Sequence, residues 1–114
     1  MIKLYGIKNC DTVRKARKWL EQNGVDHSFS DYRDEALSKN ALEKWYDAVG
    51  EKLLNKRSTT WKQLSESERA ADDKASIVAL LAQHPTLIKR PVLVKADTVH
   101  VGFSDKDYQT LTAN

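Results

Sequence analysis

The first third of the chain combines two spacings of apolar side chains. Residues 2–7 form a short apolar run with a β-favouring tyrosine, which predicts a strand, and residues 12–22 have apolar side chains at helical spacing. The positions that produce these patterns are Ile2, Leu4, Ile7, Val13, Ala16 and Leu20. The Asn-Gly pair at 23–24 is a typical helix stop signal, and residues 25–32 alternate loosely as a second strand. A β-α-β unit is therefore predicted.

The middle of the chain is predicted to be helical. Helical segments are predicted over residues 39–49, 59–64 and 75–83. Ser38 is a candidate N-cap for the first of these, and Ser65 with Glu68 has the spacing of a capping box for another short helix. The acidic pair at 72–73 is suited to the start of the last helix, which we expect to end at the His-Pro pair at 84–85.

The last part of the chain predicts a hairpin followed by a helix. Strands are predicted over residues 92–94 and 99–103, with a turn at Asp97-Thr98 between them, and Ser104 with Asp107 predicts the start of a final helix. The whole order is β-α-β, a helical middle, then β-β-α. This order predicts an α/β fold with a thioredoxin-like core and a mixed sheet. We expect a single domain over residues 1–114, with a helical insertion at about residues 36–84.

Composition and charge exclude several classes of protein. Hydrophobic residues make up 40% of the chain and charged residues 31%, which predicts a folded domain with a charged surface. The net charge of +3 is compatible with a small anionic ligand and does not require nucleic acid. The three histidines are scattered, so no metal site is expected. We find no apolar stretch suited to a signal peptide or a membrane span, and we expect a cytoplasmic location.

The chemistry most clearly indicated is that of Cys10, the single cysteine of the chain. It lies where the first strand ends and a helix begins, so free amide N–H groups and the positive end of the helix dipole favour its thiolate. Lys8 and Arg14 could add to this effect. Asp11 either opposes it or caps the helix. The alternative is an inert buried cysteine, which the polar neighbours of Cys10 disfavour.

A second feature of this loop is the absence of a partner thiol. Val13 occupies the place of the second cysteine in a Cys-x-x-Cys pair, so a resolving thiol must come from outside the chain.

The segment from Tyr5 to Ala16 resembles the start of the arsenate reductase-like (ArsC/Spx) family. That family includes glutathione/glutaredoxin-linked arsenate reductases and Spx-type regulators, and the chain is most similar to its YffB-like branch. Further matching segments, which extend the resemblance over nearly the whole chain, are residues 53–57, 59–61, 84–91 and 102–103.

The resemblance implies a thioredoxin (glutaredoxin-like) fold with an inserted helical region and a nucleophilic role for Cys10. It also implies a cis peptide bond before Pro91 and an Arg90 side chain that holds an oxyanion or the thiolate. The enteric arsenate reductases of the family use three arginines to bind the anion. Arg90 matches one of them, whereas Asn55 and Gly102 stand at the other two positions, which disfavours arsenate.

The leading hypothesis is a glutathione-dependent thiol reductase in which the Cys10 thiolate attacks an oxidised thiol and glutathione resolves the mixed disulfide. Glutathione is then a co-substrate, and no tightly bound cofactor is expected. An oxidised protein thiol or a small oxyanion is a further expected partner, while a membrane or nucleic acid is not. The residues expected to bind substrate or glutathione are Lys8, Asn9, Asp11, Thr12, Arg14, Asn55, Arg57, Arg90 and Pro91.

Several alternatives stay open at this level. Arg57 and Arg14 are equally compatible with exposed ion pairs on a solvated surface. An arsenate reductase is the enzymatic alternative. A Spx-like regulator that binds RNA polymerase is the alternative from another class of protein.

Overall fold

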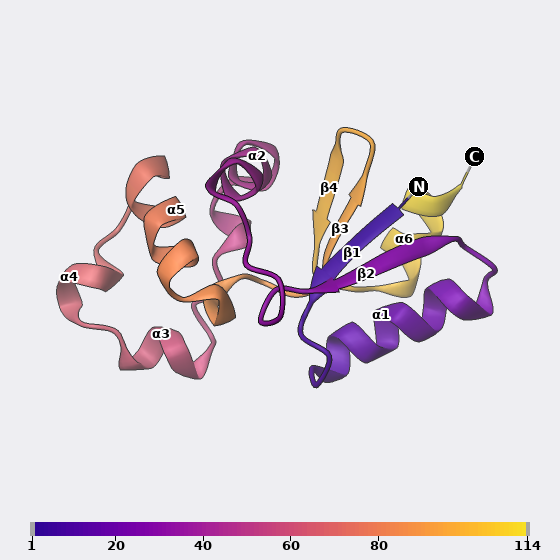
Figure 1. Cartoon of the computed structure of the whole chain (residues 1–114), viewed down its shortest axis with the longest axis horizontal. Helices are drawn as coiled ribbons and strands as arrows, with labels where there is room; N and C mark the ends of the chain where they lie inside the picture. Colours follow the sequence, from indigo (N-terminus) through magenta and orange to yellow (C-terminus); the bar gives the residue numbers. More distant parts are fainter. Residues whose placement is uncertain (1, 114) are drawn as a thin grey trace. The chain divides into compact units, whose positions relative to one another are not determined.

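The computed structural model describes residues 2–113 and separates into two compact units (Figure 1). The first unit contains the chain up to Glu35 and from Arg90 onward, and the second contains Ala36–Lys89. The second unit is built from helices, as predicted for the middle of the chain. That the two units behave as one domain stays a prediction.

The first unit is built on a four-stranded mixed sheet. Its strands are β1 (Ile2–Gly6), β2 (His27–Asp31), β3 (Val92–Lys95) and β4 (Thr98–Val101), in the spatial order β2-β1-β3-β4. Strand β1 pairs parallel to β2 and antiparallel to β3, which in turn pairs antiparallel to β4. A β-α-β half followed by a β-β-α half on such a sheet is the thioredoxin-like, glutaredoxin-like fold, as predicted.

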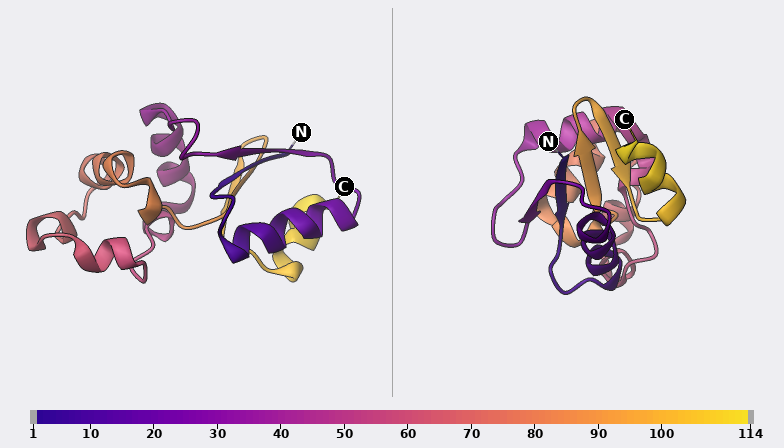
Figure 2. Two further views of the ribbon diagram at one scale, coloured as in Figure 1. Left: turned by 60° about the horizontal axis from the view of Figure 1, so that its bottom comes forward. Right: turned by 90° about the vertical axis from the view of Figure 1, so that its right-hand side faces the viewer.

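Helices α1 (Asp11–Gln22) and α6 (Asp105–Thr112) pack on the same face of this sheet (Figure 2). The side chains between sheet and helices form one fully or nearly fully buried cluster, made of Ile2, Leu4, Ala16, Leu20, Leu93 and Tyr108. Trp19 of α1 meets the Tyr108 ring of α6 edge-on, with 5.7 Å between ring centroids. The apolar spacings of residues 2–7 and 12–22 therefore mark the two surfaces that form this core.

The end of β1 lies very close to the first turn of α1. A Cβ atom at Gly6 would lie only 2.7 Å from Cγ2 of Val13, which is a branched and fully buried side chain. Glycine is thus required here by close packing, since real Cβ atoms do not approach carbon atoms so closely. This contact fixes the start of α1 against the strand that precedes the Cys10 loop.

The second unit contains four helices and two short 3₁₀ segments among the described residues. They are α2 (Lys39–Val49), η1 (Gly50–Leu53), α3 (Thr59–Gln63), α4 (Glu66–Arg69), α5 (Lys74–Gln83) and η2 (Pro85–Leu87). The predicted caps are confirmed: Ser38 accepts a hydrogen bond from an amide of the helix it precedes, and Ser65 with Glu68 forms a complete capping box. The acidic pair at 72–73 does precede α5, and Asp73 in addition caps this helix.

Backbone hydrogen bonds join the segment that follows η1 to the last residues of the second unit. Asn55 N–H donates to the Leu87 carbonyl and Lys89 N–H donates to the Leu53 carbonyl, each at 2.8 Å. Leu54 and Ile88 form an isolated antiparallel bridge between them, and both are buried. The unit therefore has its own hydrogen-bonded closure and its own buried apolar side chains.

Two details of the predicted hairpin were wrong by a few residues. The turn consists of Ala96 and Asp97, because Thr98 already pairs with Lys95, and Ala96 takes the positive φ of 53° that an alanine seldom adopts. The last strand ends at Val101, before Gly102 with φ of 83°, so Phe103 lies outside the sheet and packs against the core edge. The final helix is capped by Ser104, as predicted.

Among residues 2–113, every helix is too short or too polar to cross a lipid bilayer.

Candidate active site

Cys10 stands at the N-cap of α1, in the turn that joins β1 to this helix. Its own N–H donates to the Ile7 carbonyl at 3.1 Å, and its carbonyl accepts from Arg14 N–H at 2.9 Å. Its backbone is extended, with φ of −88° and ψ of 127°, as is usual at an N-cap. The side chain is partly exposed, so the sulfur is both held by the helix start and accessible to a reactant.

The surroundings of the sulfur favour its thiolate. Burial by itself raises the pKa of the Cys10 thiol, but hydrogen bonds outweigh it and the pKa lies below its ordinary value. The donors are the Val13 amide, the Arg90 side chain and the Thr12 amide, and the charge of Arg90 adds to them. These are amides of the first helical turn, whose N–H groups have no partner within the helix. The direction of this pKa shift agrees with the predicted effect of the helix N-terminus on Cys10, although, within the described residues, no helix amide makes a capping hydrogen bond of ordinary geometry to the sulfur.

Arg90 is the cation that acts on this sulfur. It is half-buried and directly precedes Pro91, and the peptide bond between them is cis, as expected. Arg90 also acts on the buried Tyr32 side chain: burial raises the pKa of Tyr32 to about 12, and Arg90 partly counters this. The Tyr32 hydroxyl makes no hydrogen bond of good geometry to any described residue. The charge of Arg90 therefore acts on both a thiol and a phenol.

The other charged residues predicted near Cys10 are paired elsewhere. Arg14 Nη1 donates to Asp11 Oδ1 at 2.9 Å on an exposed face of α1. Asp11 consequently does not cap the helix, because Cys10 holds the N-cap position. Lys8 Nζ pairs with Asp34 Oδ2 at 3.0 Å, also in an exposed position. The predicted roles of these residues, and of exposed Asn9, in binding a substrate stay predictions.

Asn55 and Arg57 belong to the second unit, where they line an open pocket of about 540 Å³. Asn55 Oδ1 accepts from Arg57 N–H at 3.1 Å, which shapes the loop between η1 and α3. The charged residues that line the pocket with them are Glu51, Lys52, Lys56 and Lys89. A concentration of basic side chains is suited to an anion, but that Asn55 and Arg57 contribute to the Cys10 site stays a prediction.

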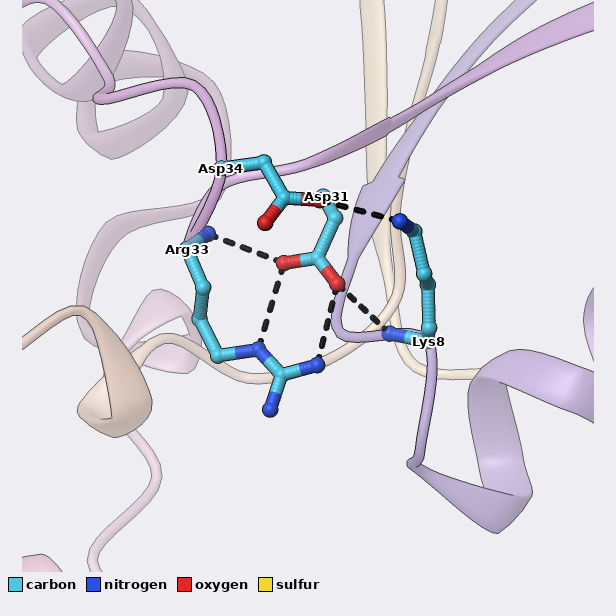
Figure 3. A network of polar contacts seen from close by, with 4 residues as sticks. All are labelled: Lys8, Asp31, Arg33 and Asp34. Carbon is cyan, nitrogen blue, oxygen red and sulfur yellow. Dashed lines mark hydrogen bonds and ion pairs between the residues drawn. The ribbon is translucent and has the colours of Figure 1, made fainter.

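The sequence-based prediction missed a buried carboxylate next to this site. Asp31, at the end of β2, is 4% exposed and accepts hydrogen bonds from Lys8 N–H at 3.0 Å and Arg33 N–H at 2.9 Å (Figure 3). The Arg33 guanidinium adds two more, from Nε at 3.3 Å and Nη2 at 3.1 Å. The local signal was an aspartate that ends a strand two residues before an arginine, which is typical of a side chain that bonds its own backbone.

No group of three or more histidine, cysteine, aspartate or glutamate side chains is arranged to hold a metal ion in the described part of the chain.

Comparison with known proteins identifies the family. The ArsC family model matches residues 5–111. An uncharacterised protein of Haemophilus influenzae is 45% identical over 99% of this chain and 100% of its own length. The solved structure of a YffB protein superposes with a TM-score of 0.95 and 37% identity, over 99% of this chain and 100% of that one. The global transcriptional regulator Spx of Bacillus subtilis is 26% identical over 94% of this chain and 83% of its own length. The chain belongs to the ArsC family.

Proposed function

We propose that the protein is a glutathione-dependent thiol reductase whose nucleophile is Cys10. The observation that supports this most directly is the sulfur at the N-cap of α1, with a lowered pKa and an arginine beside it. A thiolate that is both stabilised and accessible is the reactive form of cysteine. Because the chain has a single cysteine, the second thiol of the reaction is external.

The reaction proceeds in two exchanges. The Cys10 thiolate attacks the glutathione sulfur of a mixed disulfide, a Cys10–glutathione disulfide forms, and the substrate leaves as a thiolate. A second glutathione thiolate then attacks the glutathione sulfur of that disulfide, releases oxidised glutathione and restores the Cys10 thiolate. One free glutathione thiol is consumed: the glutathionyl group removed from the substrate and this second glutathione form oxidised glutathione, the substrate is released as a thiol, and no further oxidant or reductant is required. A reducing compartment such as the cytoplasm supplies the glutathione.

Three features of the site have roles in these steps. The Thr12 and Val13 amides and Arg90 stabilise Cys10 as the attacking thiolate and again as the leaving group of the second exchange. Arg90 and Lys8 would bind the two carboxylates of glutathione, Lys8 by exchanging its exposed pair with Asp34. Arginine suits a carboxylate because its planar fork reaches both oxygens. The rest of the proposed binding surface in the first unit consists of Asn9, Asp11, Thr12, Arg14 and Pro91. A role of Asn55 and Arg57 in binding glutathione belongs to the same proposal.

Arsenate reduction is the less favoured enzymatic candidate. In the resemblance to arsenate reductases, Asn55 and Gly102 stand where anion-binding arginines are expected. Gly102 has no side chain to offer, and its N–H already donates to the Pro91 carbonyl at 2.9 Å. A weakened oxyanion site favours a disulfide, which requires no oxyanion to be held.

A regulatory function is the second candidate, and the similarity to Spx supports it. Such a protein would bind RNA polymerase through its surface, without turnover. Val13 in place of a second cysteine removes the intramolecular disulfide that could act as a switch, so its trigger would differ.

The test is turnover of a glutathionylated peptide by the wild-type protein and by Cys10→Ser, followed through glutathione oxidation. We expect activity to fall to the uncatalysed rate in Cys10→Ser, with Ser28→Ala as an exposed control that keeps it. Full activity in Cys10→Ser would refute the enzymatic proposal. Wild-type protein that shows no turnover of disulfide or arsenate, yet binds RNA polymerase equally well with and without the thiol, would establish the regulatory candidate.

A further inference from the structure

In the described part of the chain, few backbone hydrogen bonds stabilise the turn that contains Cys10. Between the end of β1 and the start of α1, its backbone bonds are those from Cys10 N–H to Ile7 and from Arg14 N–H to Cys10. Lys8 and Asn9 between them are exposed. A turn of this kind requires an outside contact if its sulfur is to stay aligned with the amides of the first helical turn.

Asp31 supplies that contact from the neighbouring strand. Its Oδ2 accepts from Lys8 N–H at 3.0 Å, across 23 residues of sequence. The register of the parallel pair explains the reach, because Gly6 of β1 lies opposite Asp31 and the next N–H, that of Tyr32, donates to the Gly6 carbonyl at 3.2 Å. The contact between β2 and the first segment thus continues beyond the last residue of β1, into the turn that contains Cys10.

The carboxylate is itself rigidly held. Four N–H groups, from Lys8 and Arg33, converge on its two oxygens, and its side chain is only 2% exposed. This arrangement uses the acceptor capacity that a carboxylate offers and an amide does not. Figure 3 shows the side chain enclosed between the Arg33 fork and the Lys8 backbone. A carboxylate held by four hydrogen bonds has little freedom to move, so it keeps the Lys8 amide at a fixed position relative to β2.

We propose that Asp31 is a positioning residue that holds the Lys8 amide, and through it the Cys10 turn, so that the sulfur stays at the N-terminus of α1. Asp31 does not touch the reacting atoms. The inference deepens the proposed function, since it concerns the same sulfur, but it depends only on the reactivity of that sulfur and not on the identity of the substrate.

The proposal predicts an effect opposite in sign to that of charge alone. Removal of a nearby negative charge should, by electrostatics, make the Cys10 thiolate easier to form and speed its alkylation. Loss of the Asp31 carboxylate should instead let the Cys10 turn move. The thiolate would then be less stabilised by the start of α1 and by Arg90, and alkylation would slow. The direction of the change therefore separates positioning from simple electrostatics.

The experiment is the pH dependence of Cys10 alkylation by iodoacetamide in the wild type, Asp31→Ala and Asp31→Asn. We expect alkylation at pH 6.5 to slow about three- to tenfold in Asp31→Ala, with the midpoint shifted to higher pH, and to slow by less in Asp31→Asn, which keeps one acceptor oxygen. The control is Asp34→Asn, which removes the charge of the exposed ion pair with Lys8 Nζ but leaves the Lys8 amide bonded to Asp31. Alkylation that is unchanged or faster in both folded Asp31 variants would overturn the proposal.

A measurement on the unmodified protein guards against variants that fail to fold. We expect the Lys8 amide of the wild type to exchange with solvent much more slowly than an exposed amide, because Asp31 accepts its hydrogen. Rapid exchange at Lys8 would overturn the proposal without any substitution. Absence of disulfide turnover in the wild type would end the proposed function while leaving both of these results in place.

Discussion

The two units hold their cations in different ways. In the first unit, half-buried Arg90 faces one sulfur and lowers its pKa. In the second unit, exposed Lys56, Arg57 and Lys89 surround an open pocket of about 540 Å³. Lys89 and Arg90 are neighbours in the sequence, yet they belong to different units. The contrast teaches that the orientation of a cation toward the sulfur and its burial, rather than the number of cations, decide whether it activates a thiol.

The same difference applies to carboxylates, and it predicts the largest effect. Buried Asp31 is bound by Arg33 and the Lys8 amide, whereas Asp11 forms an exposed pair with Arg14. We expect Asp31→Asn to lower the free energy of unfolding by roughly 2–4 kcal/mol at pH 7, because it leaves buried donors without an acceptor. Asp11→Asn should cost less than about 1 kcal/mol. Chemical denaturation at pH 7 measures both, and equal losses would remove the distinction between buried and exposed pairs.

The stability that the Asp31 carboxylate contributes should depend on pH in a definite direction. The Arg33 side chain, acting against burial, holds the pKa of Asp31 well below its usual range, with help from the Lys8 and Arg33 amides. A carboxyl with a lowered pKa in the folded state stabilises the protein above its unfolded pKa of about 3.9. That contribution is lost as the pH falls from there through the folded pKa. The stability difference between wild type and Asp31→Asn should therefore shrink below about pH 4, whereas a constant difference would contradict the assignment.

Close packing at the end of β1 predicts the next effect. Gly6→Ala places a Cβ atom 2.7 Å from Val13 Cγ2, so strand and helix must separate. We expect a loss of about 1–3 kcal/mol in the free energy of unfolding. Because the clash is with a methyl group of Val13, the double variant with Val13→Ala should be more stable than the sum of the single losses predicts. Strict additivity in this double-mutant cycle would show that the contact with Val13 is not the cause of the stability lost in Gly6→Ala.

The smallest predicted effect compares the cations directly. Arg90→Ala should slow alkylation of Cys10 at pH 6.5 by roughly tenfold, which corresponds to about 1.4 kcal/mol, because the thiolate loses a hydrogen bond and a charge. Lys89→Ala, the adjacent residue, should leave the alkylation profile unchanged. A similar slowing in both variants would mean that general positive charge, and not the aim of Arg90, activates the sulfur. Raising the salt concentration should then abolish both effects.

The parts of the fold that were predictable from the sequence are those with local signals. Ser38, Ser65, Asp73 and Ser104 were placed correctly before helices because a cap and its amide lie within three residues. The hairpin turn was predicted one residue too late in the sequence. Ala96 adopts a positive φ that alanine does not favour, so the sequence gives no sign that the turn begins there.

The candidate site was predictable in the same unequal way. Cys10 was found from its place between a strand and a helix, and Arg90 from the resemblance to a known family. Asp31 was missed because its role depends on a hydrogen bond to Lys8 across 23 residues, which follows from the pairing of β1 with β2 and not from any local pattern. Long-range contacts of this kind are visible only once the strands are in register.

The separation of the chain into two units has a consequence for how this protein can vary. All the groups that set the reactivity of Cys10, namely the Thr12 and Val13 amides and Arg90, belong to the first unit, as does Asp31. The second unit is an uninterrupted stretch, Ala36–Lys89, inserted between them and closed by its own hydrogen bonds. The stretch can accordingly be exchanged as one uninterrupted segment without removing any of these groups from the chain.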